Sequence, residues 1–229
     1  MRKIFILLLI PLLLSSCIED SLFTDSHNGS IIFKIDWGNR RENSELYKKI
    51  VIENDTLELL DTNIIISDIK LIGENNTYNL SDYLMLKDVK SVSFRSVKFD
   101  SYKISFTIGL DTTIHNNLNS FENLYINDNY YILKSIISDR YNEKTYFYNL
   151  TDISKEISYF DASLDGFKPG AGIFVNQAEI YINLENILLT PNIINKDELT
   201  ESVIDNEKLQ IKMFENLKNS SIKANFIYD

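Results

Sequence analysis

The feature that most constrains the fold is a set of segments in which apolar and polar residues alternate with a period of two. In residues 102–109, for example, Ile104, Phe106 and Ile108 fall on one face of an extended chain, because successive side chains of a strand point to opposite sides. The apolar positions are mostly β-branched or aromatic, which favours strands over helices. The alternating segments are residues 29–37, 63–73, 91–99, 102–109, 130–138, 144–150 and 176–188.

Two of these segments define apolar faces in more detail. In residues 63–73, Ile65, Ile69 and Leu71 share a face that Ser67 interrupts, and in residues 176–188 the apolar face is expected to hold Ala178, Ile180, Ile182 and Leu184. No long helical crossover separates the strands, so the pattern predicts an all-β fold, an antiparallel β-sandwich. With only 7 glycines and 3 prolines, asparagine and aspartate are the expected turn formers.

One short helix is predicted near the C-terminus, over residues 205–219. Its apolar residues recur at helical spacing, and Asp205 is the candidate N-cap. We expect this stripe to pack against a sheet, with an extended segment closing the chain. The apolar stripe consists of Leu209, Met213, Phe214 and Leu217.

The N-terminus has the pattern of an export signal. Arg2 and Lys3 precede an apolar run of 11 residues, Ile4–Leu14, whereas a membrane-spanning helix needs about 20. Leu14-Ser15-Ser16-Cys17 matches the lipobox of bacterial lipoproteins, in which the cysteine receives the lipid. The sequence therefore predicts a signal peptide (1–16), a lipid-anchored Cys17 within a tether (17–29), and one domain (30–229).

Cys17 is the only cysteine, so its lipidation leaves no thiol for disulfides or metal ligation. We expect attachment to the outer membrane. The acidic stretch Ile18–Ser21 either resembles a signal for export to the cell surface or is simply a solvated tether. Which side of the membrane the protein faces, periplasmic or external, therefore stays open.

Charge and missing motifs narrow the function. Removal of residues 1–16 leaves 21 basic and 33 acidic residues, a net charge of −12, so nucleic acid is not an expected partner. The glycines form no dinucleotide fingerprint, P-loop or nucleophile elbow, and the two histidines, His27 and His115, are too far apart for a HExxH helix. A non-enzymatic protein is expected.

Two further patterns could indicate a binding site, but each also has a purely structural interpretation. Asp161, Ser163, Asp165 and Gly166 match the first ligand positions and the glycine of a calcium loop, but Gly172 occupies the position of the bidentate glutamate. A wide turn is the favoured reading of these residues. Thirteen tyrosines and 13 phenylalanines could provide stacking platforms for a glycan, or form core and sheet surface.

The order of the segments resembles the MbnP-like domain family, β-rich exported domains associated with copper and often found on lipoproteins. The likeness lies in residues 31–37 ("IIFKIDW"), 63–86 ("NIIISDIKLIGENNTYNLSDYLML") and 103–111 ("KISFTIGLD"), and it would extend over residues 30–190. The resemblance implies a β-sandwich binding domain with copper as the associated metal.

The family usually carries Asn-His shortly after the glycine turn, where this chain has Ile114-His115-Asn116. The family's later Met/Trp-rich and histidine-containing elements have no counterpart with those residues. Imidazole is a good copper ligand, so His115, with Asp111, is the metal-site candidate. The alternative to a metal-associated domain is a surface module that binds a glycan or an envelope protein.

Overall fold

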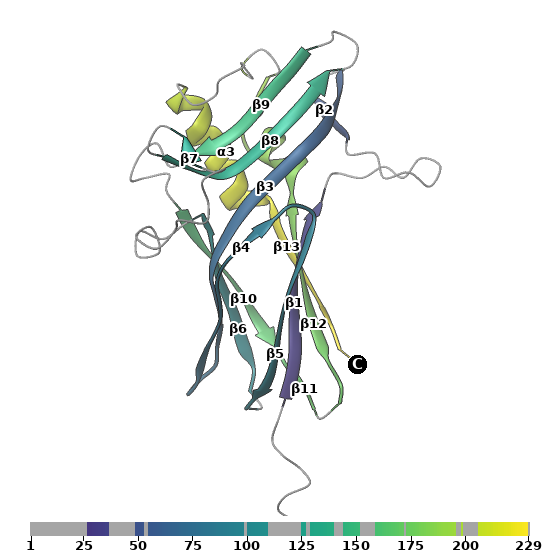
Figure 1. The fold of residues 1–229 in the computed structure, drawn as a ribbon, viewed down its shortest axis with the longest axis vertical. Coiled ribbons are helices and arrows are strands. Elements are labelled where there is room, and N and C mark those ends of the chain that lie inside the picture. Colours follow the sequence, from purple (N-terminus) through teal and green to yellow (C-terminus); the bar gives the residue numbers. More distant parts are fainter. Residues whose placement is uncertain are drawn as a thin grey trace, which may run out of the picture.

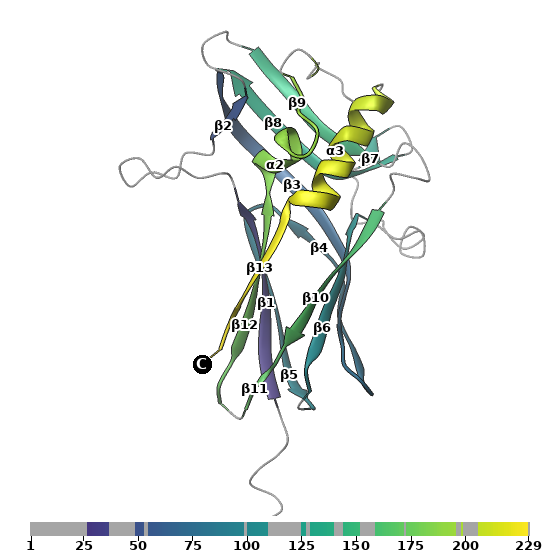
Figure 2. The ribbon, with the colours of Figure 1, turned by 180° about the vertical axis from the view of Figure 1, so that it is seen from behind.

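The computed structural model describes residues 27–36, 49–52, 55–98, 100–109, 125–126, 129–139, 144–151, 159–171, 173–195, 198 and 206–228. They form two β-sheets and two helices (Figures 1 and 2). The first sheet contains β1 (His27–Asp36), β5 (Val89–Val97), β11 (Gly170–Ala171), β12 (Asn176–Asn183) and β13 (Ile222–Ile227). The second contains β2 (Lys49–Ile52), β3 (Asp55–Ile72), β4 (Thr77–Leu86), β6 (Tyr102–Gly109), β7 (Tyr125–Ile126), β8 (Asn129–Asp139), β9 (Lys144–Thr151) and β10 (Tyr159–Phe167).

The predicted β-sandwich is confirmed. In the lower half of Figure 1 the first sheet faces β4, β6, β10 and the end of β3. The two sheets meet through aromatic contacts: Phe33 of β1 and Phe106 of β6 lie edge to face, with ring centroids 5.2 Å apart. Phe167 of β10 similarly contacts Phe94 and Phe226 of the first sheet at 6.0 and 5.7 Å. These perpendicular ring pairs stabilise the core beyond simple burial.

Strand β3 joins the two halves of the molecule. Its end, Ile64–Ile72, pairs with β4 and β6 in the sandwich, while its beginning pairs with β2 and β8 in the upper half. A bulge lies between Ser67 and Lys70, where Asp68 adopts a positive φ of 51°. Ser67 is fully buried, and its hydroxyl donates to the carbonyl of Gly109 at 2.7 Å. The predicted interruption of the apolar face is therefore a buried hydrogen bond.

Strand β1 lies inside the first sheet, antiparallel to β5 and β11 and parallel to β12. The parallel pair matches Gly29 to Asn176 and Asp36 to Asn183. It departs from the antiparallel pairing expected from the sequence, which the other described strand pairs follow. β1 begins at His27, three residues before the predicted start of the domain.

The strand predicted over residues 176–188 is shorter than expected. β12 ends at Asn183, whose side chain accepts a hydrogen bond from the amide of Asn186 at 2.8 Å and caps helix α2 (Leu184–Leu189). Leu184, Ile187 and Leu188 are buried at helical spacing, so Leu184 continues the core from a helix rather than a strand.

The predicted C-terminal helix is α3 (Glu207–Ser220), and its four predicted apolar residues are buried. Its N-cap is Asn206 rather than Asp205, because the Asn206 side chain accepts from the amide of Leu209 at 3.2 Å. Figure 2 shows α2 and α3 together in front of the upper part of the second sheet, so both helices cover the same face of it.

Asn216 of α3 joins the two helices. Its side-chain amide, fully buried, donates to the carbonyls of Ile187 and Asn192 at 2.9 and 2.6 Å. Its carbonyl oxygen accepts from the Asn192 amide at 2.7 Å. One side chain therefore satisfies three backbone groups at the end of α2.

Candidate functional site

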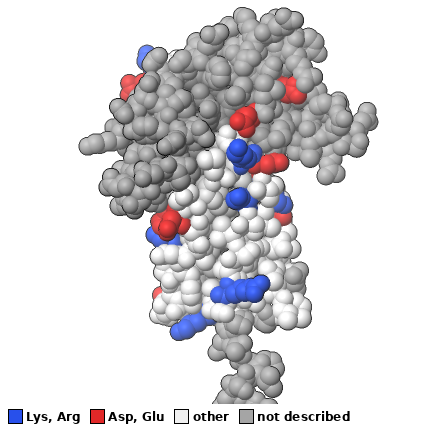
Figure 3. Space-filling view, in the orientation of Figure 1, with Lys and Arg blue, Asp and Glu red and all other residues white. Residues whose placement is uncertain are grey.

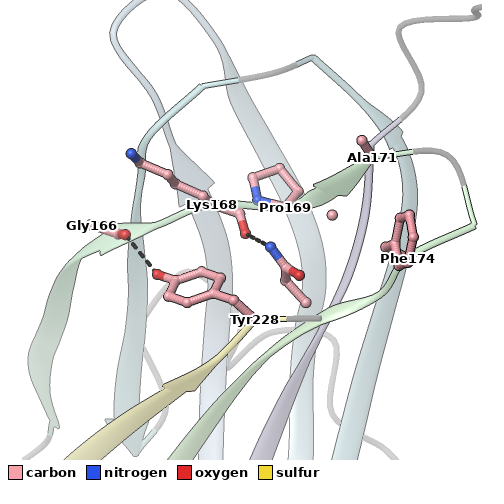
Figure 4. Close-up of a pocket in the computed structure, with 8 residues that line it drawn as sticks. Gly166, Lys168, Pro169, Ala171, Phe174 and Tyr228 are labelled. Atoms are coloured by element: carbon pink, nitrogen blue, oxygen red, sulfur yellow. Dashed lines mark hydrogen bonds between the residues drawn. The ribbon is translucent and has the colours of Figure 1, made fainter.

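An open cavity of about 590 Å³ lies at the lower end of the sandwich, where β10, β11, β12 and β13 meet (Figure 4). Here "lower end" means the start of β1 and β6, the ends of β3, β5, β10 and β13, and the turns that join them. The residues that line the cavity are Gly166, Lys168, Pro169, Gly170, Ala171, Phe174, Asn176 and Tyr228.

Hydrogen bonds fix the walls of this cavity. The Asn176 side-chain amide donates to the Lys168 carbonyl at 2.7 Å, and the Tyr228 hydroxyl donates to the Gly166 carbonyl at 3.1 Å. The backbone packs tightly at Gly170, where a Cβ atom would lie 2.6 Å from the carbonyl oxygen of Phe174. The turn carrying Phe174 is closed by a hydrogen bond from its own amide to the Ala171 carbonyl at 3.1 Å.

Apolar side chains project from this turn into solvent. Ile173 is 91% exposed and Phe174 54%, and Tyr228 on the neighbouring chain end is 50% exposed. Val175 and Ile227 are also exposed. The exposed apolar side chains therefore gather at one end of the described molecule.

A second ordered group lies on the outer face of the first sheet. Lys34 of β1 is hydrogen-bonded to Glu179 of β12, and the Tyr181 hydroxyl donates to the same carboxylate at 2.5 Å. The Lys34 ammonium also lies 5.4 Å from the centre of the Tyr181 ring. The parallel pairing of β1 and β12, which sets Lys34 opposite Tyr181, brings the three side chains together.

Charge pairing shifts the titration of this group. The hydrogen bond from Lys34, followed by that from Tyr181, lowers the pKa of Glu179. The hydrogen bond to Glu179 raises the pKa of Lys34 and that of Tyr181. The arrangement is a fixed ion pair on a polar sheet face, and its three members satisfy one another.

The site residues predicted from the sequence lie outside the described residues: Cys17, Asp111 and His115. The described residues that precede Asp111 and His115 end at Gly109, the last residue of β6, where φ is 101°. Within the described residues, no group of three or more His, Cys, Asp or Glu side chains is placed to hold a metal ion.

The residues that match a calcium loop belong to a strand. Asp161, Ser163 and Asp165 are alternate, exposed residues of β10, and Asp161 accepts a hydrogen bond from the Thr107 hydroxyl at 2.6 Å. β10 continues to Phe167, so the change of direction comes later than the predicted turn. None of the helices among the described residues has the length and apolar character needed to span a bilayer.

Sequence reasoning missed the cavity and the turn beside it. The available signal was the run Ile173-Phe174-Val175, three apolar residues that directly follow Gly170-Ala171-Gly172 and precede a strand. A continuous apolar run between strands, where a turn normally carries polar residues, could have drawn attention to this turn, though not to the cavity.

The comparisons with known proteins give one distant likeness. No protein-family model matches the chain, and no curated protein matches it. Among solved structures, MbnP from Methylosinus trichosporium is similar over 73% of this chain and 79% of that chain, with 8% sequence identity and a TM-score of 0.46. In structure, the chain is a β-sandwich distantly similar to MbnP.

Proposed function

We propose that this chain is a lipid-anchored protein of the cell envelope whose β-sandwich works by binding and not by catalysis. The observation that carries the proposal is the lipobox ending at Cys17, the only cysteine, ten residues before the first strand begins. Several acyl chains on one cysteine anchor a protein stably, since each buried CH₂ contributes about 0.8 kcal/mol. The outer membrane is the proposed location.

Lipid attachment is tested by growing cells with an alkyne analogue of palmitate. The wild-type protein should incorporate the label and sediment with membranes, whereas Cys17→Ser should do neither. The control Ser16→Ala keeps a small residue before the cysteine and should be labelled like wild type. Labelling of Cys17→Ser, or an unlabelled wild type, contradicts the proposal.

The proposed ligand is a metal ion, with copper first, held through Asp111 and His115. The observation that favours it is that β6 ends at Gly109, at the end of the sandwich opposite the start of β1. Asp111 lies two residues beyond Gly109 and His115 six. A carboxylate and an imidazole are both ligands for divalent transition metals.

Anaerobic copper titration of the purified protein tests this assignment. Binding tighter than about 10 μM, or roughly 7 kcal/mol, is expected for the wild type and should be lost in His115→Ala. His27→Ala is the matched control, because it removes the chain's other histidine. Weak binding, or binding unaltered by His115→Ala, would rule the metal site out.

A second candidate ligand is a glycan or an envelope protein bound at the outer face of the first sheet. The fixed group of Lys34, Glu179 and Tyr181 favours it, because ordered polar side chains and an aromatic ring suit polar partners. Protease treatment of intact cells tests it. A surface module must be cleaved, and protection in intact cells but not in lysed cells would contradict surface binding.

A further inference from the structure

The exposed apolar residues of the described chain are concentrated at the lower end. Five of the nine large apolar side chains that are strongly exposed lie there, and the other four are spread over β4, β5, the segment after α2 and α3. The five are Ile173, Phe174, Val175, Ile227 and Tyr228. Phe174 and Tyr228 line the same cavity (Figure 4), and the other three residues are their direct neighbours in the chain.

The same end receives the anchored N-terminus. β1 begins at His27, which pairs with Ala171, two residues from Ile173. Ten peptide units separate Cys17 from His27, so their Cα atoms lie at most about 35 Å apart. β3 alone, which runs from the upper to the lower end with 18 residues, is on the order of 60 Å long. A domain anchored at Cys17 therefore cannot stand upright on its upper end.

Charge at the lower end differs from that of the whole chain. The chain has a net charge of −10. Yet Arg95, Lys98, Lys103 and Lys168 are exposed at the lower end, against the acidic residues Glu74, Asp100 and Asp165. Figure 3 shows basic side chains near the lower end of one face, with little acidic surface beside them. Basic groups beside apolar ones favour contact with anionic lipid headgroups.

The outer face of the first sheet is less suited to contact with the bilayer than the lower end. The outer face of the first sheet carries the mutually satisfied group of Lys34, Glu179 and Tyr181, whose contact with a bilayer would require desolvation of an ion pair. The turn at Ile173 offers apolar side chains, and beside it the chain end offers Tyr228, an aromatic residue type that is enriched at the membrane interface.

We propose that the lower end is a membrane-contact surface, in which Ile173, Phe174 and Tyr228 enter the headgroup region of the bilayer that holds Cys17. The inference rests on the proposed function in one respect, attachment at Cys17. It fixes the orientation of the domain: the long axis stands away from the bilayer, and the upper end, with β8, β9 and the two helices, points outward.

The test uses the full protein, isolated from cells and placed in vesicles of phosphatidylethanolamine and phosphatidylglycerol with brominated acyl chains. Bromine quenches tryptophan fluorescence at short range. The single native tryptophan, Trp37, is changed to Phe, and a reporter is introduced as Ile173→Trp or, separately, Phe174→Trp. Ile193→Trp is the matched control, because Ile193 is 65% exposed and follows α2 at the upper end.

The expected result is quenching of the reporters at 173 and 174 by at least about twofold, with little change at 193. Equal quenching at 173 and 193, or none at 173 and 174, would overturn the inference, and the latter would favour a soluble glycan or protein at the aromatic cavity. Because Ile173 is almost fully exposed, Ile173→Trp leaves the core unchanged.

A separate measurement shows whether the proposed lipid anchor itself is present. Mass spectrometry of the isolated protein shows whether Cys17 is acylated. If Cys17 carries a free thiol, the proposed anchor is wrong. In that case the thiol can be coupled to a maleimide phospholipid in the vesicles, and the quenching measurement is repeated. Quenching at 173 and 174 then still supports the contact surface, and its absence overturns it.

Discussion

The carboxamide of Asn176 donates a hydrogen bond to the carbonyl oxygen of Lys168 at 2.7 Å, across the turn that carries Ile173 and Phe174. Asn176 is the first residue of β12 and is 8% exposed. This bond joins the start of one strand to the segment that follows another, so the exposed apolar turn stands on a fixed base.

Asn176→Ala should lower the free energy of unfolding by about 1–3 kcal/mol, because the part-buried hydrogen bond to the Lys168 carbonyl is lost and a small void forms. Urea denaturation followed by tyrosine fluorescence or circular dichroism measures the change. Gln177→Ala, at the neighbouring half-buried position, is the control and should cost clearly less. Equal losses would show that the hydrogen bond has no special role.

Gly29→Ala should destabilise the sandwich by about 1–3 kcal/mol through overpacking. A Cβ atom at residue 29 would lie 2.4 Å from the Phe94 ring and 3.1 Å from the carbonyl oxygen of Asn176. A double-mutant cycle with Phe94→Leu checks the cause. The added methyl group should cost less when the ring is absent, and a cost independent of residue 94 would point to the backbone instead.

Stability should fall at acidic pH in a way that depends on Glu179. Its pKa is lowered by the hydrogen bond from Lys34, so the folded state favours the carboxylate. The stabilisation is complete above the ordinary value of 4.5 and is lost as the pH falls through the lowered pKa. Glu179→Gln should therefore cost about 1 kcal/mol at neutral pH and progressively less below about pH 4.5.

Urea titrations of wild type and Glu179→Gln at a series of pH values measure this difference. The control is Glu74→Gln, which changes an exposed carboxylate at the lower end. The difference in free energy of unfolding between wild type and Glu74→Gln should not shrink in the same way as the pH falls. A difference between wild type and Glu179→Gln that stayed constant with pH would argue against the ion pair as its source.

Asn216→Ala should be among the more damaging polar substitutions, costing about 2–4 kcal/mol, because it leaves backbone groups of Ile187 and Asn192 without their partner inside the helix pair. Thermal and urea unfolding measure the loss. Asn219→Ala changes an exposed asparagine of the same helix and should stay within about 0.5 kcal/mol of wild type.

Local alternation was enough to predict several strands. β6 has the predicted bounds, Tyr102–Gly109, because its apolar residues Ile104, Phe106 and Ile108 alternate with polar ones and Gly109 ends the pattern. The beginning of β3 was missed: residues 55–62 contain five polar side chains among eight, and that pattern reads as a loop. Pairing on both edges, with β2 and β8, makes this segment a strand, and such long-range pairing is not visible in a local window.

Asparagine explains the error at the end of β12. In the sequence, Asn183 follows Gln177, Glu179 and Tyr181 at every second position, so it was read as part of the strand. An asparagine is equally suitable as the N-cap of a helix, and in the structure Asn183 ends β12 and caps α2. The lower-end cavity could not be predicted, because its walls come from β10, β11, β12 and the chain end after β13. The parallel pair of β1 and β12 was likewise invisible, since strand direction in a sheet depends on topology rather than on composition.

The position of β1 between β12 and β5 has a mechanical consequence. A pull on the N-terminus, as the proposed anchor at Cys17 would exert, acts along the axis of β1, so it shears the hydrogen bonds to both neighbouring strands at once instead of opening them one by one. A strand at the edge of the sheet, such as β13, would peel away from one partner under the same force. The proposed anchor would therefore load the sheet through an interior strand, which resists such a pull better than an edge strand.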